Sequence, residues 1–162
     1  MRSSNNDLGA IQIMNFVRIA TIISTLGPIG YFGGSGTVAT IVTLPFVYWT
    51  HAEIPSQRLY LGFIVCMFVL SMVLVHYALK NFKRHDDPSE IVLDEVMGCL
   101  LTFWGIALTP KSVLVGFLLF RALDIIKFGL VKKAESFADA WGVIGDDMVA
   151  ALIANGILRL LF

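Results

Sequence analysis

The most constraining feature of this sequence is a long apolar run from Leu59 to Leu79, LYLGFIVCMFVLSMVLVHYAL. Its only acidic or basic residue is His76, which lies near the end of the run. A helix over these residues would be roughly 31 Å long, which is about the thickness of the hydrocarbon core of a bilayer. We therefore predict that this segment forms a helix that crosses a membrane.

The composition agrees with a membrane protein. Hydrophobic residues make up 57% of the 162 residues and charged residues only 15%, whereas a soluble domain carries about 25% charged residues. The formal net charge is zero, so nothing indicates a nucleic-acid partner. The two cysteines, Cys66 and Cys99, lie in apolar runs without metal-ligand spacing, and we expect both to be reduced.

Four weaker apolar segments surround this run, and several of them are short for a full span. They could be tilted, re-entrant or packed inside the bundle. The sequence thus predicts an all-α, polytopic membrane helical bundle of about four to five apolar helices plus short surface helices. We expect one domain over residues 1–162, with 1–25 as an N-terminal cytoplasmic segment. The weaker segments are Thr37–Trp49, Ile91–Leu108, Ser112–Ile126 and Met148–Phe162.

The charged residues predict the orientation. If every segment crosses, nine Lys and Arg residues fall on one side and three on the other, and the positive-inside rule makes the richer side cytoplasmic. Eleven of the twelve acidic residues lie on or next to that same side, with Glu53 as the exception. Segments far apart in the sequence would therefore bring their carboxylates to one depth.

Such carboxylates must either stay hydrated at the membrane boundary or have their charge neutralised by a cation. The reason is that moving a charged group to mid-bilayer costs about 2.5–3.5 kcal/mol of free energy on insertion scales. Carboxylate oxygens are hard ligands that suit Mg²⁺ or Ca²⁺, and no His/Cys cluster indicates zinc. Asp87, Glu90 and Asp94 have the i, i+3, i+7 spacing of one helix face if a helix begins near Pro88. Glu95 would then point about 100° away from Asp94.

Two further segments add charges of both signs. Arg121 and Asp124 share a helix face at i, i+3, and Lys127 follows three residues further on. Asp146 and Asp147 are expected in the first turn of a helix, where the helix dipole favours anions. Each acidic residue alone could be a simple helix cap, but capping does not require three acidic clusters at one membrane face.

Acidic clusters with Arg and Lys at a membrane surface indicate phosphate chemistry, in which Mg²⁺ bridges carboxylates and phosphoryl oxygens. The sequence lacks the P-loop, Cys-x₅-Arg, Asp-x-Asp, paired-histidine and Gly-x-Ser-x-Gly motifs of other enzymes that act on phosphates or esters. In the glycine-rich stretch 26–37, the backbone of Gly36 and Thr37 could approach a phosphate at a helix start. The alternative is a flexible loop in which Thr37 caps the helix.

Four motifs in order resemble the phosphatidylglycerophosphatase A family. They are GPIGYFGGSGTVATIVTLP from Gly27, HDDPSEIVLDEVMG from His85, FRALDIIK from Phe120 and GVIGDDMVA from Gly142. The sequence departs from the family pattern after Lys127, where Phe-Gly-Leu stands in place of the usual Pro-x-Pro. All charged motif residues are present.

The resemblance implies a Mg²⁺-dependent enzyme of the bacterial inner membrane whose active site faces the cytoplasm. It would hydrolyse the phospholipid phosphatidylglycerophosphate to phosphatidylglycerol and phosphate. The competing hypothesis is a small non-enzymatic transporter or assembly subunit with ion-binding acidic residues, for which Asn155 in the last apolar run would be suitable.

By motif position, the resemblance carries the family's acidic and basic residues over to this sequence. We assign roles to them and to the Gly36–Thr37 backbone as a hypothesis, in which direct attack by water and a phosphoaspartate intermediate both stay open. Metal ligands would be Asp87, Glu90, Asp94 and Asp147; catalytic residues would be Asp94, Glu95, Asp124 and Asp146; substrate-binding residues would be Gly36, Thr37, Arg121 and Lys127.

Overall fold

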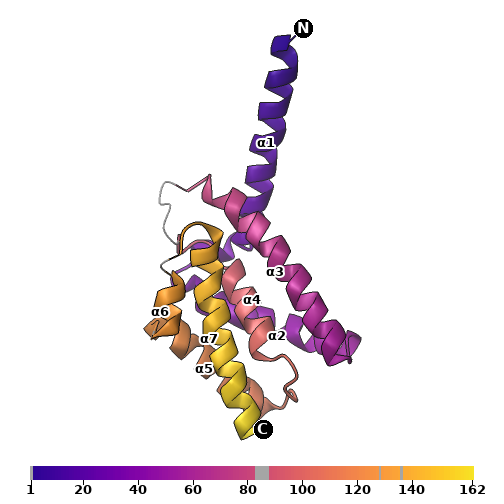
Figure 1. The fold of residues 1–162 in the computed structure, drawn as a ribbon, viewed down its shortest axis with the longest axis vertical. Helices are drawn as coiled ribbons and strands as arrows, with labels where there is room; N and C mark the ends of the chain where they lie inside the picture. Colours follow the sequence, from indigo (N-terminus) through magenta and orange to yellow (C-terminus); the bar gives the residue numbers. More distant parts are fainter. Residues whose placement is uncertain (1, 83–87, 128, 136) are drawn as a thin grey trace.

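The computed structural model describes residues 2–82, 88–127, 129–135 and 137–162, and every regular element in these ranges is a helix (Figure 1). The all-α prediction is therefore confirmed. The elements are α1 (Arg2–Ser24), the short 3₁₀ helix η1 (Ile29–Tyr31), α2 (Ser35–Glu53), α3 (Gln57–Leu79), α4 (Leu93–Thr102), α5 (Pro110–Ile126), α6 (Leu130–Glu135) and α7 (Ala140–Leu161).

Helix α4 is the centre of the bundle, where it packs against α2, α3, α5 and α7. All of its residues are buried except Glu95, which is half-buried. A helix of 10 residues is about 15 Å long, half the thickness of a bilayer core. The prediction that Ile91–Leu108 crosses the membrane as one helix is therefore wrong. The alternative prediction, that this segment packs inside the bundle, describes α4. The helix ends at Thr102, and the chain then turns at Gly105, which has a left-handed φ of +68°.

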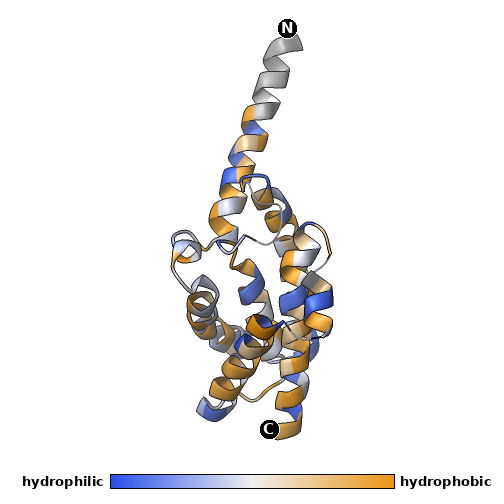
Figure 2. Cartoon of the chain, turned by 90° about the vertical axis from the view of Figure 1, so that its left-hand side faces the viewer, coloured by the Kyte–Doolittle hydropathy of each residue, from blue (hydrophilic) through white to orange (hydrophobic). Residues whose placement is uncertain are grey.

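Helix α3 contains the predicted span Leu59–Leu79. Among the described residues it is the one helix that is long and apolar enough to cross a membrane. Val65, Val69 and Val73 on its outer surface are 43–57% exposed. Figure 2 shows hydrophobic residues along the helices in the half of the molecule that holds the C-terminus.

Helix α7 begins eight residues earlier than the predicted segment Met148–Phe162. Asp146 and Asp147 are its seventh and eighth residues, so the prediction that they open a helix is wrong. The preceding turns form because Ala140, Val143 and Ile144 bury an apolar face against the bundle. The two carboxylates consequently lie inside the packed part of the helix.

Nearly all of residues 1–25, the predicted N-terminal cytoplasmic segment, form helix α1. This helix packs along α3 and then extends away from the bundle towards the N-terminus (Figure 1). The rings of Phe16 and Tyr77 meet edge to face at 4.8 Å. At its other end, the Ser24 carbonyl oxygen accepts a hydrogen bond from the Val92 N–H, which ties α1 to the start of α4.

The glycine-rich segment between α1 and α2 holds the start of α4 in place. A Cβ on Gly30 would overlap the Glu90 carbonyl oxygen, so only glycine allows this close approach. The Ser35 hydroxyl donates a hydrogen bond of 2.8 Å to the Ser89 carbonyl oxygen. These contacts place the first turn of α4 beside the first turn of α2.

Candidate active site

Four helix segments meet at a cleft of about 330 Å³. They are the first turn of α2, the first turn of α4, the last turn of α5 and the second turn of α7. The cleft is lined by Gly34, Ser35, Gly36, Ser89, Ile91, Asp94, Glu95, Arg121, Asp124, Ile125, Lys127, Asp146 and Asp147.

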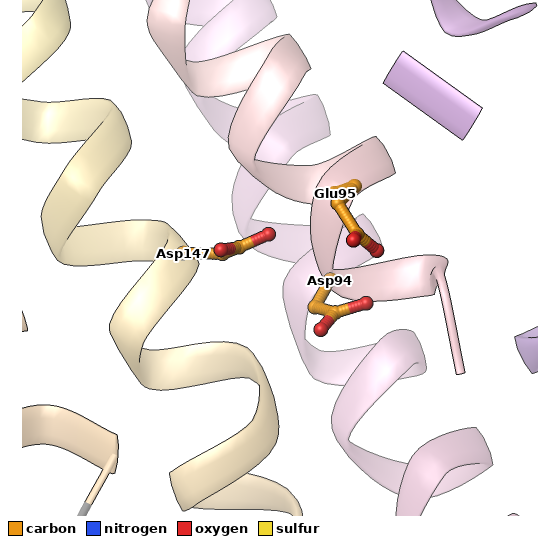
Figure 3. Close-up of side chains that lie close together, drawn as sticks. All are labelled: Asp94, Glu95 and Asp147. Atoms are coloured by element: carbon orange, nitrogen blue, oxygen red, sulfur yellow. The ribbon is translucent and has the colours of Figure 1, made fainter. Parts of the chain in front are cut away.

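The carboxylates in the cleft form two groups that share one member. Asp94, Glu95 and Asp147 offer oxygen atoms that all lie within 4.8 Å of one another, and so do Asp124, Asp146 and Asp147. In the first group, Asp147 projects from α7 towards the two acidic residues of α4 (Figure 3). Residues 94, 124 and 147, which are far apart in the sequence, thus reach one site.

Two basic side chains balance part of this charge. Arg121 Nη1 lies 2.5 Å from Asp124 Oδ2 and 3.5 Å from Glu95 Oε1. The second basic residue, Lys127, lies with its Nζ 2.8 Å from Asp146 Oδ2. Arg121 and Asp124 are one turn apart on α5, as the i, i+3 spacing predicted. Lys127 ends that helix in a left-handed conformation, with φ of +46°.

Gly36 allows Glu95 and Arg121 to approach the backbone of α2. A Cβ at this position would overlap Glu95 Oε1 and would lie 2.9 Å from Arg121 Nη2. The glycine therefore has a steric role that can be read from the structure, in addition to the predicted role of its N–H towards phosphate.

Burial governs the protonation of two carboxyls, both of which lie outside α3. Burial raises the pKa of Asp147 well above its ordinary range, and the charges of Asp124, Glu95 and Asp146 raise it further. Burial also raises the pKa of Glu95, by more than the hydrogen bond with Asp94 and the charge of Arg121 lower it. Within the described residues, no N–H or hydroxyl group donates to Asp147 Oδ2 or Glu95 Oε2.

These observations fit a divalent cation. The donors are carboxylate oxygens, which Mg²⁺ prefers, and two of them are buried without a hydrogen-bond donor. A cation between them would favour the ionised carboxylates that burial alone disfavours. Within the described part of the chain, both groups of converging donors consist of carboxylates alone, the ligand type that hard cations prefer.

The structure brings together most of the residues that were assigned roles from the sequence. The cleft contains Gly36, Asp94, Glu95, Arg121, Asp124, Lys127, Asp146 and Asp147. Thr37 does not line it, and Glu90 lies outside the lining and outside both carboxylate groups, so their roles stay predictions. Asp87 lies outside the described residues.

The predicted helix face of Asp87, Glu90 and Asp94 is wrong because α4 begins only at Leu93. Glu95 still joins the site, since it fills the space between α4 and α2 that Gly36 leaves open. Sequence reasoning missed five lining residues, namely Gly34, Ser35, Ser89, Ile91 and Ile125. Nothing in their spacing distinguishes them from other loop or helix residues.

Comparison with known proteins gives a family and one relative. The family described as phosphatidylglycerophosphatase A matches residues 22–162. A protein of Bacteroides thetaiotaomicron named "Putative phosphatidylinositol-3-phosphatase" is 34% identical over 70 residues, which are 41% of this chain and 44% of that relative. This chain thus matches less than half of that relative's length. No solved structure matches the chain.

Proposed function

The chain belongs to the phosphatidylglycerophosphatase A family, and from that premise we propose that it is a Mg²⁺-dependent lipid phosphomonoesterase. Its substrate would be phosphatidylglycerophosphate and its products phosphatidylglycerol and phosphate. The reaction would take place at the cytoplasmic face of the bacterial inner membrane.

One observation carries this proposal: five carboxylates and two basic side chains from distant parts of a family member converge on one cleft. Carboxylates that hold a cation and basic groups that bind phosphate oxygens are the two requirements of phosphoryl transfer. A transporter should place polar groups near mid-membrane on several helices. Asn155, the residue that suited a transporter, instead donates to the backbone oxygens of Thr102 and Trp104.

Asp94, Glu95 and Asp147 would hold Mg²⁺, since their oxygens already converge. When bound, Mg²⁺ supplies positive charge that polarises the phosphate and offsets the charge that develops on its oxygens. All other contributions come from the side chains and backbone of the chain itself.

Arg121 and Lys127 would bind the phosphate oxygens from the α5 side of the cleft. Both are partly exposed and held by carboxylates, so they are oriented before the substrate arrives. Binding of phosphate by Arg121 would loosen its ion pair with Asp124. Asp124 would then orient the attacking water and accept its proton, and the leaving lipid alkoxide would take a proton from solvent water.

A lipid substrate is supported by the apolar surface around the cleft. Ile125 lines the cleft and is 66% exposed, and the adjacent Ile126 is 70% exposed. We propose that the glycerol and acyl portion of the substrate rests on these side chains.

We also propose that the chain crosses the membrane more than once. Exposed apolar residues on three helices besides α3 support this proposal. They are Ile41 and Val42 of α2, Leu114 and Leu118 of α5, and Leu152 and Leu160 of α7.

The test is release of phosphate from phosphatidylglycerophosphate by the purified protein in detergent micelles. We expect activity with Mg²⁺, none after EDTA, and recovery when Mg²⁺ is restored. Asp94→Asn and Asp147→Asn should lose at least about 10²-fold in kcat/KM, whereas the exposed Glu53→Gln at the end of α2 should match the wild type.

Phosphatidylinositol 3-phosphate is a second substrate to assay, because the Bacteroides relative carries the name of a phosphatase for that lipid. A preference for it would replace the proposed substrate and keep the reaction type. Full activity in both Asp variants would contradict the assignment of the site.

A further inference from the structure

The charges that line the cleft do not balance. Among the described residues that line it, five acidic groups (Asp94, Glu95, Asp124, Asp146 and Asp147) face two basic groups (Arg121 and Lys127), which gives these residues a formal charge of −3 when all are ionised. A phosphate monoester adds a charge of about −2. One divalent cation would leave a formal charge of about −3 in a partly buried site, whereas two would leave about −1. The charge of the site with substrate therefore favours two cations.

The carboxylate oxygens of the cleft also form two groups, each of which could hold one cation. One group of converging oxygens consists of Asp94, Glu95 and Asp147, and the other of Asp124, Asp146 and Asp147. Each group supplies three carboxylates from two helices. One ion at the first group would leave Asp124 and Asp146 with Arg121 and Lys127 as their partners, and those basic groups are the ones available to bind phosphate.

Asp147 gives an independent indication of a ligand. It is 2% exposed, and no donor among the described residues reaches its Oδ2 atom. The side chain points from α7 into the space in front of Asp94 and Glu95 (Figure 3). A carboxylate in such a position requires a positive partner, and the two basic side chains of the cleft pair with other carboxylates.

From these observations we infer that the cleft binds two divalent cations, one at each carboxylate group, and that Asp147 is a ligand of both. The inference rests on the proposed function, because it concerns the cations that the phosphatase reaction would use. It assigns separate tasks to residues that sequence reasoning had grouped together. Asp94 and Glu95 serve one ion, and Asp124 and Asp146 serve the other; Asp124 would bind that ion through one carboxylate oxygen and accept the proton of the attacking water through its second oxygen.

The experiment uses Mn²⁺ as the probe, with the full-length protein in detergent. The protein is freed of metal with EDTA, exchanged into EDTA-free buffer and titrated with Mn²⁺ in the presence of inorganic phosphate. Calorimetry and elemental analysis should give two Mn²⁺ ions per chain. Because ions that share a carboxylate are magnetically coupled, the electron paramagnetic resonance spectrum should show exchange coupling.

The variants separate the two positions. Asp124→Asn should bind one Mn²⁺ with the six-line spectrum of an isolated ion, and Asp94→Asn should lose the other ion with the same spectral result. Asp147→Asn should abolish the coupling. Glu53→Gln is the matched control, because it removes an exposed carboxylate outside the cleft and should retain two coupled ions.

The outcomes distinguish this inference from the proposed function. One uncoupled Mn²⁺ per chain in a protein that releases phosphate would overturn the two-cation site and leave the phosphatase intact. Two uncoupled ions would overturn the shared role of Asp147. Two coupled ions in a protein inactive on every lipid phosphate would support the inference and overturn the proposed function.

Discussion

At the scale of single residues, the site depends on the absence of a side chain at Gly36. A Cβ there would meet the ends of two flexible side chains, Glu95 and Arg121, and both can move aside. Their displacement would change the site more than the fold. We therefore predict that Gly36→Ala remains folded, with a change in Tm of only a few degrees, and loses about 10²-fold in kcat/KM.

The measurement combines thermal unfolding with phosphate release. Gly62→Ala in α3 is the control, since a Cβ on Gly62 would meet no atom within 4 Å. It should keep full activity. If Gly36→Ala were as active as the wild type, Gly36 would have no steric role at the site.

The buried Asp147 carboxyl predicts an unusual pH dependence of the metal-free protein. In the unfolded chain the pKa of an Asp carboxyl is about 3.9. In the folded protein, burial raises the pKa of Asp147. Between these two pKa values the unfolded state has lost the proton and the folded state retains it. Stability from this group is thus greatest at low pH and decreases as pH rises through the window.

Asp147→Asn removes this dependence. In the presence of EDTA near neutral pH, the variant should have a higher Tm than the wild type, because its amide does not have to ionise inside the packed site. Melting curves between about pH 5 and pH 8 should show a shallower slope for the variant. If the Tm of the variant and the Tm of the wild type changed equally with pH, ionisation of Asp147 would not destabilise the folded protein, and this prediction would be wrong.

At the scale of elements, α7 is fixed to the far end of α4 by two polar side chains, Asn155 and Arg159, and Arg159 Nη2 donates a hydrogen bond of 2.8 Å to the Trp104 carbonyl oxygen. Asn155 donates hydrogen bonds of 2.9 Å and 2.8 Å to the carbonyl oxygens of Thr102 and Trp104, and its Oδ1 accepts from Arg159 Nε. Thr102 is the last residue of α4 and Trp104 follows shortly after it, so these carbonyl groups lie where the helix provides no donors of its own. Asn155 therefore closes the end of the central helix.

Asn155→Ala should lower the free energy of unfolding by about 1–3 kcal/mol, since it removes two donors to backbone oxygens at this helix end. Activity of the folded protein should be unchanged, because Asn155 lies about 12 Å along α7 from Asp147. Unfolding in detergent and kcat/KM are the two measurements. Leu152→Ala on the exposed side of α7 should cost much less, and equal losses would show that the hydrogen bonds contribute little.

At the scale of the whole molecule, the bundle is apolar outside as well as inside. Val69 lies near the middle of α3 and is 57% exposed. A lysine at the centre of a membrane helix costs about 2.5–3.5 kcal/mol on insertion scales. We predict that Val69→Lys lowers the fraction of protein that stays with membranes after alkaline carbonate extraction.

Gln57→Lys is the control, because Gln57 begins α3 and its lysine could remain in the headgroup region. It should be retained like the wild type. Unchanged retention of Val69→Lys would indicate that α3 is not in contact with the hydrocarbon core.

The sequence predicted local features well where one short-range rule decided them. The apolar run Leu59–Leu79 lies within α3, and the spacing of Arg121 and Asp124 correctly placed both on one helix face. The sequence-based predictions were wrong where contacts between helices, and not the local hydrophobic pattern, set the helix boundaries. The helix at Ile91–Leu108 is only 10 residues long, and Asp146 and Asp147 are inside a helix instead of at its start.

By itself, the sequence determined the helical class, the apolar character and which carboxylates and basic residues are available. Those properties follow from composition and periodicity, which act over a few turns of chain. Only the tertiary structure decided that Asp94, Asp124 and Asp147 share one cleft, that Glu90 lies outside it, and that Gly36 leaves space for Glu95. Such distances depend on how the helices pack around α4, and packing is set by contacts between residues far apart in the sequence.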